Sequence, residues 1–133
     1  MKKIEHIGIA VKDIDISNKI FTKIFGKSAY KSERVESEEV ITSFFQVGES
    51  KIELVAATNE ESPIHKYLSK NKNGMHHIAF SVDNIMNEIE RLKKEGIRIL
   101  NEIPKKGADN KLVCFLHPKD TSGVLIELCQ EIR

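Results

Sequence analysis

The stretch that decides the fold is HIGIAV, from His6 to Val11, because the chain writes it again as HIAFSV, from His77 to Val82. The second copy begins 71 residues after the first, and the apolar positions of the two copies coincide. Self-similarity at a fixed offset sets the architecture of a chain. Two copies are too few for a solenoid, so the repeat predicts a pseudo-symmetric pair of modules.

A second short motif is also written twice. The letters IEL surround Glu53 and recur around Glu127, 74 residues later. The two offsets differ by three residues, which one loop insertion absorbs at little cost. Each copy of the repeat therefore offers one histidine and one glutamate at an equivalent place.

Each copy predicts the same order of elements: a strand, a helix and three further strands. Alternation of period two predicts the first strand, and paired extended stretches at 40–47 and 51–56, and again at 111–117 and 123–130, predict hairpin-like ends. Two helices are predicted by apolar residues at helical spacing, with glycines placed to end them: Ile16, Ile20 and Ile24 before Gly26, and Ile85, Ile89 and Leu92 between Asn84 and Gly96.

We therefore predict an α+β fold in which two βαβββ modules form a pseudo-twofold, open, barrel-like sheet around a metal site. A chain of 133 residues has room for one domain with a real core. We expect a single domain over 1–133, with module one at about 1–60, a linker helix at about 61–74 and module two at about 75–133.

Composition excludes several classes of partner. The chain has 21 Lys and Arg against 20 Asp and Glu, a net charge of +1, which predicts no nucleic-acid or membrane partner. No apolar run approaches the roughly 20 residues that cross a bilayer. We expect a cytoplasmic protein in which Cys114 and Cys129 are free buried thiols, with a disulfide between them as the alternative.

The faces of the histidine strands carry the functional argument. His6 shares its face with Gly8 and Ala10, and small residues of this kind leave space beside the ring. A single strand histidine, or a single glutamate in an apolar strand, is more often structural than a ligand. The repetition of both residue types shifts the balance, since a buried carboxylate is costly unless it is paired or bound to a cation. The predicted ligand set is His6, Glu53, His77 and Glu127.

Two imidazoles and two carboxylates suit a borderline or hard divalent ion. Cobalt, nickel, zinc, manganese and magnesium are all candidates for this ion. Water would complete the coordination and leave positions open to a substrate.

The doubled βαβββ pattern with its His, Glu, His, Glu order resembles the vicinal oxygen chelate superfamily. Within it, the chain is similar essentially end to end to the methylmalonyl-CoA epimerases, through EHIGIAV, SPIHKYL, GMHHIAFSVDNI, FLHPKD and GVLIELCQ. The resemblance implies a homodimer acting on an acyl-CoA substrate. It implies metal ligands at His6, His77 and Glu127, and places Glu53 where some family members have Gln.

The implied reaction interconverts (2R)- and (2S)-methylmalonyl-CoA by abstraction of the α-proton through a metal-stabilised enolate. Inversion needs two acid/base groups, one on each side of the carbon. Glu127 is the candidate for one of them. Some epimerases carry a second Glu where this chain has Thr42, which leaves Glu53, a metal-bound water or another group as the second base.

Three other functions compete with this interpretation. A glyoxalase I isomerase uses the same ligand places but acts on a glutathione hemithioacetal. An iron-dependent extradiol dioxygenase uses two histidines and one carboxylate, although such enzymes are usually longer than this chain. A non-catalytic small-molecule binding member of the superfamily often lacks the full ligand set, which is present here.

Overall fold

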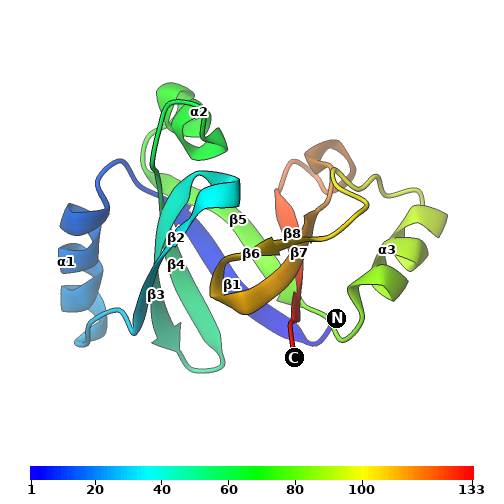
Figure 1. Ribbon diagram of the computed structural model, residues 1–133, viewed down its shortest axis with the longest axis horizontal. Helices are drawn as coiled ribbons and strands as arrows, with labels where there is room; N and C mark the ends of the chain where they lie inside the picture. The colour runs from blue at the N-terminus through cyan, green and yellow to red at the C-terminus, as the bar shows by residue number, and fades with distance from the viewer. The chain divides into compact units, whose positions relative to one another are not determined.

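The computed structural model describes residues 1–133 and contains the predicted doubled order of elements (Figure 1). The α+β fold class is therefore confirmed. The first half contains β1 (Lys3–Ala10), α1 (Ile14–Phe25), β2 (Lys31–Val35), β3 (Val40–Val47) and β4 (Ser50–Ala57). The second half contains α2 (Pro63–Lys70), β5 (Gly74–Ser81), α3 (Ile85–Lys94), β6 (Lys105–Gly107), β7 (Lys111–Phe115) and β8 (Ile126–Glu131).

The chain groups into two compact units whose boundaries cut across the repeat. One unit contains residues 1–6 and 77–133, and the other contains residues 7–76. We call them the discontinuous unit and the continuous unit. The predicted division into two modules and a linker helix stays a prediction.

In the continuous unit, β2, β3 and β4 pair antiparallel in that order. Helix α1 packs on β3 and β4 (Figure 1). It begins after Asp13, whose side chain accepts a hydrogen bond from the backbone N–H of Ile16, and it ends at Gly26 in the left-handed region at φ 71°. The core beneath it contains Val11, Phe45, Leu54 and Ala56, with Phe21 and Phe25 of the helix packed against them.

The row of isoleucines that predicted α1 faces away from this core. The exposed fractions are 59% for Ile16, 48% for Ile20 and 62% for Ile24. The helix instead packs through Phe21 and Phe25, which lie on its other side. The helix is thus confirmed, whereas the apolar row that identified it is a surface feature.

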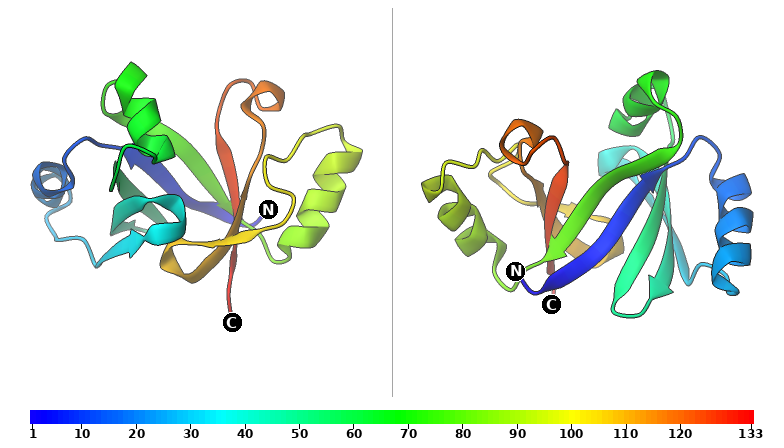
Figure 2. Two further views of the ribbon diagram at one scale, coloured as in Figure 1. Left: turned by 45° about the horizontal axis from the view of Figure 1, so that its top comes forward. Right: turned by 180° about the vertical axis from the view of Figure 1, so that it is seen from behind.

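In the discontinuous unit, β5 pairs parallel with β8, and β8 pairs antiparallel with β7. Strand β1 is the neighbour of β5 on the other side, and the two run side by side in opposite directions (Figure 2). Helix α3 packs on this sheet through the predicted residues. Its stripe of Ile85, Ile89 and Leu92 joins a buried cluster with Cys114, Leu116 and Leu128.

The two cysteines agree with the sequence expectation of free thiols. Cys114 and Cys129 are both buried, and they form no disulfide with each other. Of the three α-helices, none has both the length and the apolar character needed to cross a membrane.

Candidate metal centre

Three neighbouring strands bring His6, His77 and Glu127 together. They come from β1, β5 and β8, which are adjacent in the sheet order. Glu127 stands beside Ala79 in the parallel register of β5 and β8. His77 lies two residues before Ala79 and therefore on the same face of the sheet. The pairing of the strands thus turns residues far apart in sequence into one cluster.

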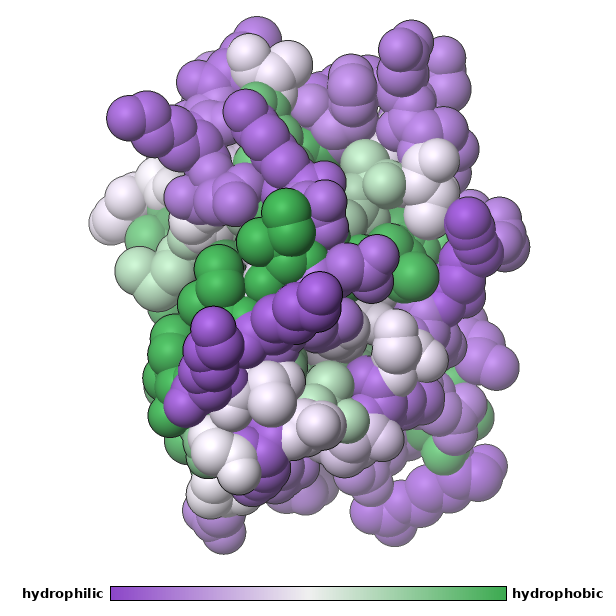
Figure 3. Space-filling view, turned by 90° about the vertical axis from the view of Figure 1, so that its left-hand side faces the viewer, coloured by the Kyte–Doolittle hydropathy of each residue, from purple (hydrophilic) through white to green (hydrophobic).

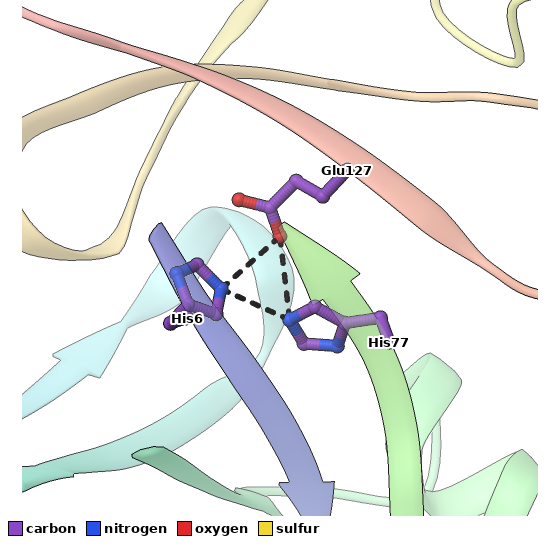
Figure 4. A group of neighbouring side chains, drawn as sticks. All are labelled: His6, His77 and Glu127. Carbon is purple, nitrogen blue, oxygen red and sulfur yellow. Dashed lines mark hydrogen bonds and ion pairs between the residues drawn. The ribbon is translucent and has the colours of Figure 1, made fainter. Parts of the chain in front are cut away.

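The three side chains point at one another (Figure 4). The Nε2 atoms of His6 and His77 are 3.1 Å apart. The Oε1 atom of Glu127 lies 3.6 Å from Nε2 of His6 and 3.4 Å from Nε2 of His77. Two nitrogens and one oxygen therefore form a small triangle of donor atoms.

This triangle has the size that a first-row divalent ion requires. For an ion at about 2.1 Å from each donor, neighbouring donors lie about 3.0 Å apart in octahedral geometry and about 3.4 Å apart in tetrahedral geometry. The three observed separations, 3.1, 3.4 and 3.6 Å, are close to these values. Three protein donors also leave coordination positions for water or a substrate, as catalytic metal sites do. The residues present fit the expected group.

The cluster is shielded from solvent. The exposed fractions are 5% for His6, 7% for His77 and 6% for Glu127. Burial alone would raise the pKa of Glu127, but the adjacent rings of His6 and His77 outweigh it and hold the pKa of Glu127 below its ordinary value. The carboxylate is thus kept ionised, which is the form that binds a cation.

Two further side chains surround the donors, and sequence patterns did not identify either. The Oε1 atom of Glu5, which is 4% exposed, lies 3.5 Å from Nδ1 of His6. This is the ring nitrogen that does not face His77. The ring of Phe115 meets the ring of His77 edge to face, with centroids 6.1 Å apart. Because side chains alternate along a strand, the sequence pattern places Glu5 on the face opposite to His6. The only sequence feature that pointed to Glu5 was therefore a charged residue within an apolar run.

The fourth predicted ligand, Glu53, belongs to the continuous unit. It is 5% exposed and stands opposite Phe44 in the pairing of β3 and β4. The three clustered donors belong to the discontinuous unit, so the part of Glu53 in the ligand set stays a prediction. Thr42, where some relatives have Glu, is also buried, and its hydroxyl donates a hydrogen bond to the backbone oxygen of Glu33 at 3.3 Å.

The remaining histidines have other surroundings. The ring of His76 meets that of Tyr67 edge to face, with centroids 4.8 Å apart. His65 lies exposed on α2. His117 immediately precedes the short 3-10 helix at Pro118–Asp120 and accepts a hydrogen bond at Nδ1 from the backbone N–H of Lys119. These contacts give His76 and His117 structural surroundings.

Comparison with known proteins gives a family that matches most of the chain. A family model described as the Glyoxalase/Bleomycin resistance protein/Dioxygenase superfamily matches residues 5–115. The mitochondrial methylmalonyl-CoA epimerase of Homo sapiens is 41% identical over 129 residues, which cover 96% of this chain and 73% of that protein. The ethylmalonyl-CoA/methylmalonyl-CoA epimerase of Cereibacter sphaeroides is 37% identical over 130 residues, which cover 96% of this chain and 97% of that protein.

Solved structures agree with these relatives. The structure of a Streptomyces coelicolor methylmalonyl-CoA epimerase variant in complex with 2-nitronate-propionyl-CoA superposes with a TM-score of 0.94 at 32% identity, covering 98% of this chain and 95% of that chain.

A lactoylglutathione lyase of Schizosaccharomyces pombe is 29% identical, and this chain spans 47% of its length.

Proposed function

Because the chain belongs to the methylmalonyl-CoA epimerases of the Glyoxalase/Bleomycin resistance protein/Dioxygenase superfamily, we propose that it interconverts (2R)- and (2S)-methylmalonyl-CoA. The observation that carries the proposal is the triangle of donor atoms from His6, His77 and Glu127 in a chain whose epimerase relatives reach 41% identity. The similarity to lactoylglutathione lyase is weaker and covers less of that protein. The epimerase is therefore favoured over a glyoxalase I activity.

The reaction that this site would serve is removal and return of one proton. The proton sits on a carbon between a thioester and a carboxylate, and its loss places negative charge on the thioester oxygen. A divalent ion, when bound, supplies the positive charge that stabilises this oxygen. The ion would be held by Nε2 of His6, Nε2 of His77 and Oε1 of Glu127. We favour cobalt, with nickel, zinc, manganese or magnesium as the other candidates.

Glu127 has a second role in the proposed reaction. One of its oxygens faces the two histidine rings, and the other points away from them (Figure 4). The lowered pKa of Glu127 keeps its carboxylate ionised at neutral pH, which is the form that a general base needs. Glu127 therefore acts as the acid/base group on one face of the substrate carbon.

Inversion needs a second acid/base group on the opposite face, and we assign it to Glu53. Glu53 is buried, and it occupies the same place in its copy of the repeat that Glu127 occupies in the other. The hydroxyl of Thr42 cannot replace the carboxylate of Glu53 as a base. The proposal also includes a cytoplasmic homodimer that takes an acyl-CoA as its small-molecule partner.

Glu5 has a positioning part in the same site. Its carboxylate lies beside Nδ1 of His6, while Nε2 of that ring faces the other donors. A carboxylate at the outer nitrogen of a ligating histidine fixes the orientation and tautomer of the ring and raises its basicity. Glu5 would thus hold His6 in the state that binds the ion.

The deciding experiment is proton NMR of methylmalonyl-CoA in D2O with the purified protein, before and after a chelator and then with added cobalt. We expect loss of the α-proton signal to stop with the chelator and to return with cobalt, and a coupled stereospecific mutase assay to show inversion. Absence of exchange in the cobalt-loaded protein would remove the substrate from the proposal. The hemithioacetal of methylglyoxal and glutathione would then be tested.

A further inference from the structure

Asn101, a partly buried residue in the loop before β6, binds the edge of β7 with both ends of its side-chain amide. Its Oδ1 atom accepts a hydrogen bond from the backbone N–H of Phe115 at 2.9 Å. Its Nδ2 atom donates a hydrogen bond to the backbone oxygen of Val113 at 3.2 Å. One side chain thus offers β7 an acceptor and a donor, as a peptide group of a neighbouring strand does.

These bonds close a gap in the pairing of β7. Ile99 pairs with β7 in an isolated bridge, and the pairing resumes at Lys105 of β6. The loop between them turns away from the sheet, and Ile103 in that loop is 84% exposed. Asn101 therefore supplies the hydrogen bonds that the backbone of the loop does not offer to this part of β7.

Phe115 is the residue through which this edge reaches the metal centre. It stands opposite Glu127 in the register of β7 and β8. Its N–H binds Asn101, and its carbonyl oxygen accepts a hydrogen bond from the N–H of Leu100 at 2.8 Å, so both groups point away from β8. Antiparallel residues of this kind form a non-hydrogen-bonded pair, in which the facing side chains approach most closely. The ring of Phe115 also meets the ring of His77 edge to face.

The support and the donors lie in one unit of the chain. Asn101, Phe115 and the three donor residues all belong to the discontinuous unit. The side of the molecule that carries α1, where hydrophobic surface lies between hydrophilic side chains (Figure 3), belongs to the continuous unit. The contacts from Asn101 to the donors therefore need no assumption about how the two units meet.

We propose that Asn101 is a positioning residue for the two donors His77 and Glu127. By holding the backbone of Phe115, it keeps Glu127 beside its partner in the register and keeps the phenyl ring against the imidazole of His77. Groups that orient the ligands of a metal ion tune its affinity without touching it. The inference rests on the metal centre of the proposed function, and Asn101 acts there only through Phe115.

NMR of the metal-free protein tests the positioning directly. In Asn101→Ala we expect the amide of Phe115 to exchange with solvent faster and the ring resonances of His77 to shift, because the phenyl ring beside them has moved. The matched control is Asn84→Ala, which removes the side-chain cap of α3 and changes the same residue type away from β7. We expect it to leave the His77 resonances in place. Unchanged His77 resonances in Asn101→Ala overturn the proposal.

Calorimetric titration with cobalt measures the consequence for the ion. We expect the affinity to fall at least about tenfold in Asn101→Ala and in Phe115→Leu, and to stay unchanged in Asn84→Ala. The double variant should lose less than the sum of the two single losses, because both act through the same ring. Fully additive losses, or an equal loss in Asn84→Ala, overturn the proposal.

Two further outcomes keep the inference separate from folding and from the proposed function. If Asn101→Ala does not fold, Phe115→Leu carries the test, and unchanged His77 resonances and cobalt affinity in that variant overturn the proposal. A wild-type protein that binds no cobalt contradicts the metal centre of the proposed function. The NMR comparison of Asn101→Ala with Asn84→Ala then still decides whether Asn101 positions His77.

Discussion

His6 and His77 face each other through their Nε2 atoms at 3.1 Å, although 71 positions separate them in the sequence. Adjacent histidine nitrogens at this distance are held together either by one shared proton or by one shared cation. The Oε1 atom of Glu127 at 3.4 and 3.6 Å favours the cation, because three donor atoms then converge on one point, whereas a proton bridges only two. The cluster is thus suited to bind an ion, and the predictions below follow from it.

Removing one donor should remove the ion. At a cobalt concentration of about 100 times Kd, the wild-type protein should gain about 2.7 kcal/mol in its free energy of unfolding. His6→Ala, His77→Ala and Glu127→Ala should lose this gain and the activity while keeping the fold. Thermal unfolding with and without cobalt measures it. His65→Ala, at an exposed position on α2, is the control, and retained full activity in any of the three variants would contradict the site.

Neutralising Glu5 should weaken the site without removing a donor. Loss of the carboxylate at the outer nitrogen of a ligating histidine typically costs about 10- to 100-fold in metal affinity. We expect this loss in Glu5→Gln by isothermal titration with cobalt, together with a change in the tautomer of His6 by ¹⁵N NMR of the imidazole. Glu60→Gln, at an exposed loop position before α2, is the control with an ordinary surface carboxylate. Unchanged affinity and tautomer in Glu5→Gln would show that Glu5 does not position His6.

Replacing Glu53 separates ion binding from inversion. The amide oxygen of Gln can still coordinate a divalent ion, so the metal affinity of Glu53→Gln should fall less than that of Glu127→Gln. Inversion should slow sharply, while exchange of the α-proton from one epimer continues through Glu127. Restoration of inversion by Thr42→Glu in the Glu53→Gln background would locate the second base at the place where some relatives have it. Equal loss of exchange from both epimers would argue against Glu53 as that base.

The pairing of Asp120 with Arg98 predicts a dependence of stability on pH. Three hydrogen bonds, two from the Arg98 side chain and one from its backbone N–H, lower the pKa of Asp120 below its ordinary value. Because the folded pKa lies below the unfolded one, this contribution is complete above the unfolded pKa of about 3.9 and is lost as pH falls through the folded pKa. Asp120→Asn should therefore lower the urea midpoint near neutral pH.

The gap between Asp120→Asn and the wild-type protein should narrow below about pH 4. Urea unfolding at several pH values measures it. Glu60→Gln, at an exposed loop position before α2, is the control. A gap that is constant across this range would show that the charge of Asp120 contributes nothing to stability.

The histidine pair could be predicted from the sequence because its signal is repeated. One histidine on a strand is uninformative, whereas His6 and His77 at equal places in two similar stretches predict side chains on equivalent faces. Glu127 was found in the same way, as the second copy of Glu53. The positions of the donor atoms followed from strand pairing, which alternation alone does not fix.

The outward row on α1 could not be predicted because the helix has two apolar stripes. Helical spacing fits Ile16, Ile20 and Ile24, and the opposite side carries Phe21 and Phe25. Both patterns have the same period, so the choice between them depends on which side chains fill the space above Phe45 and Leu54. The two phenylalanines are the larger side chains, and they take the core.

The division of the chain into a continuous and a discontinuous unit has a consequence for the metal centre. Residues 1–6 bring His6 into the unit that otherwise begins at His77. A cut between His76 and His77 therefore leaves one donor on one fragment and two on the other. Neither fragment holds all three donors, so the centre requires both copies of the repeat.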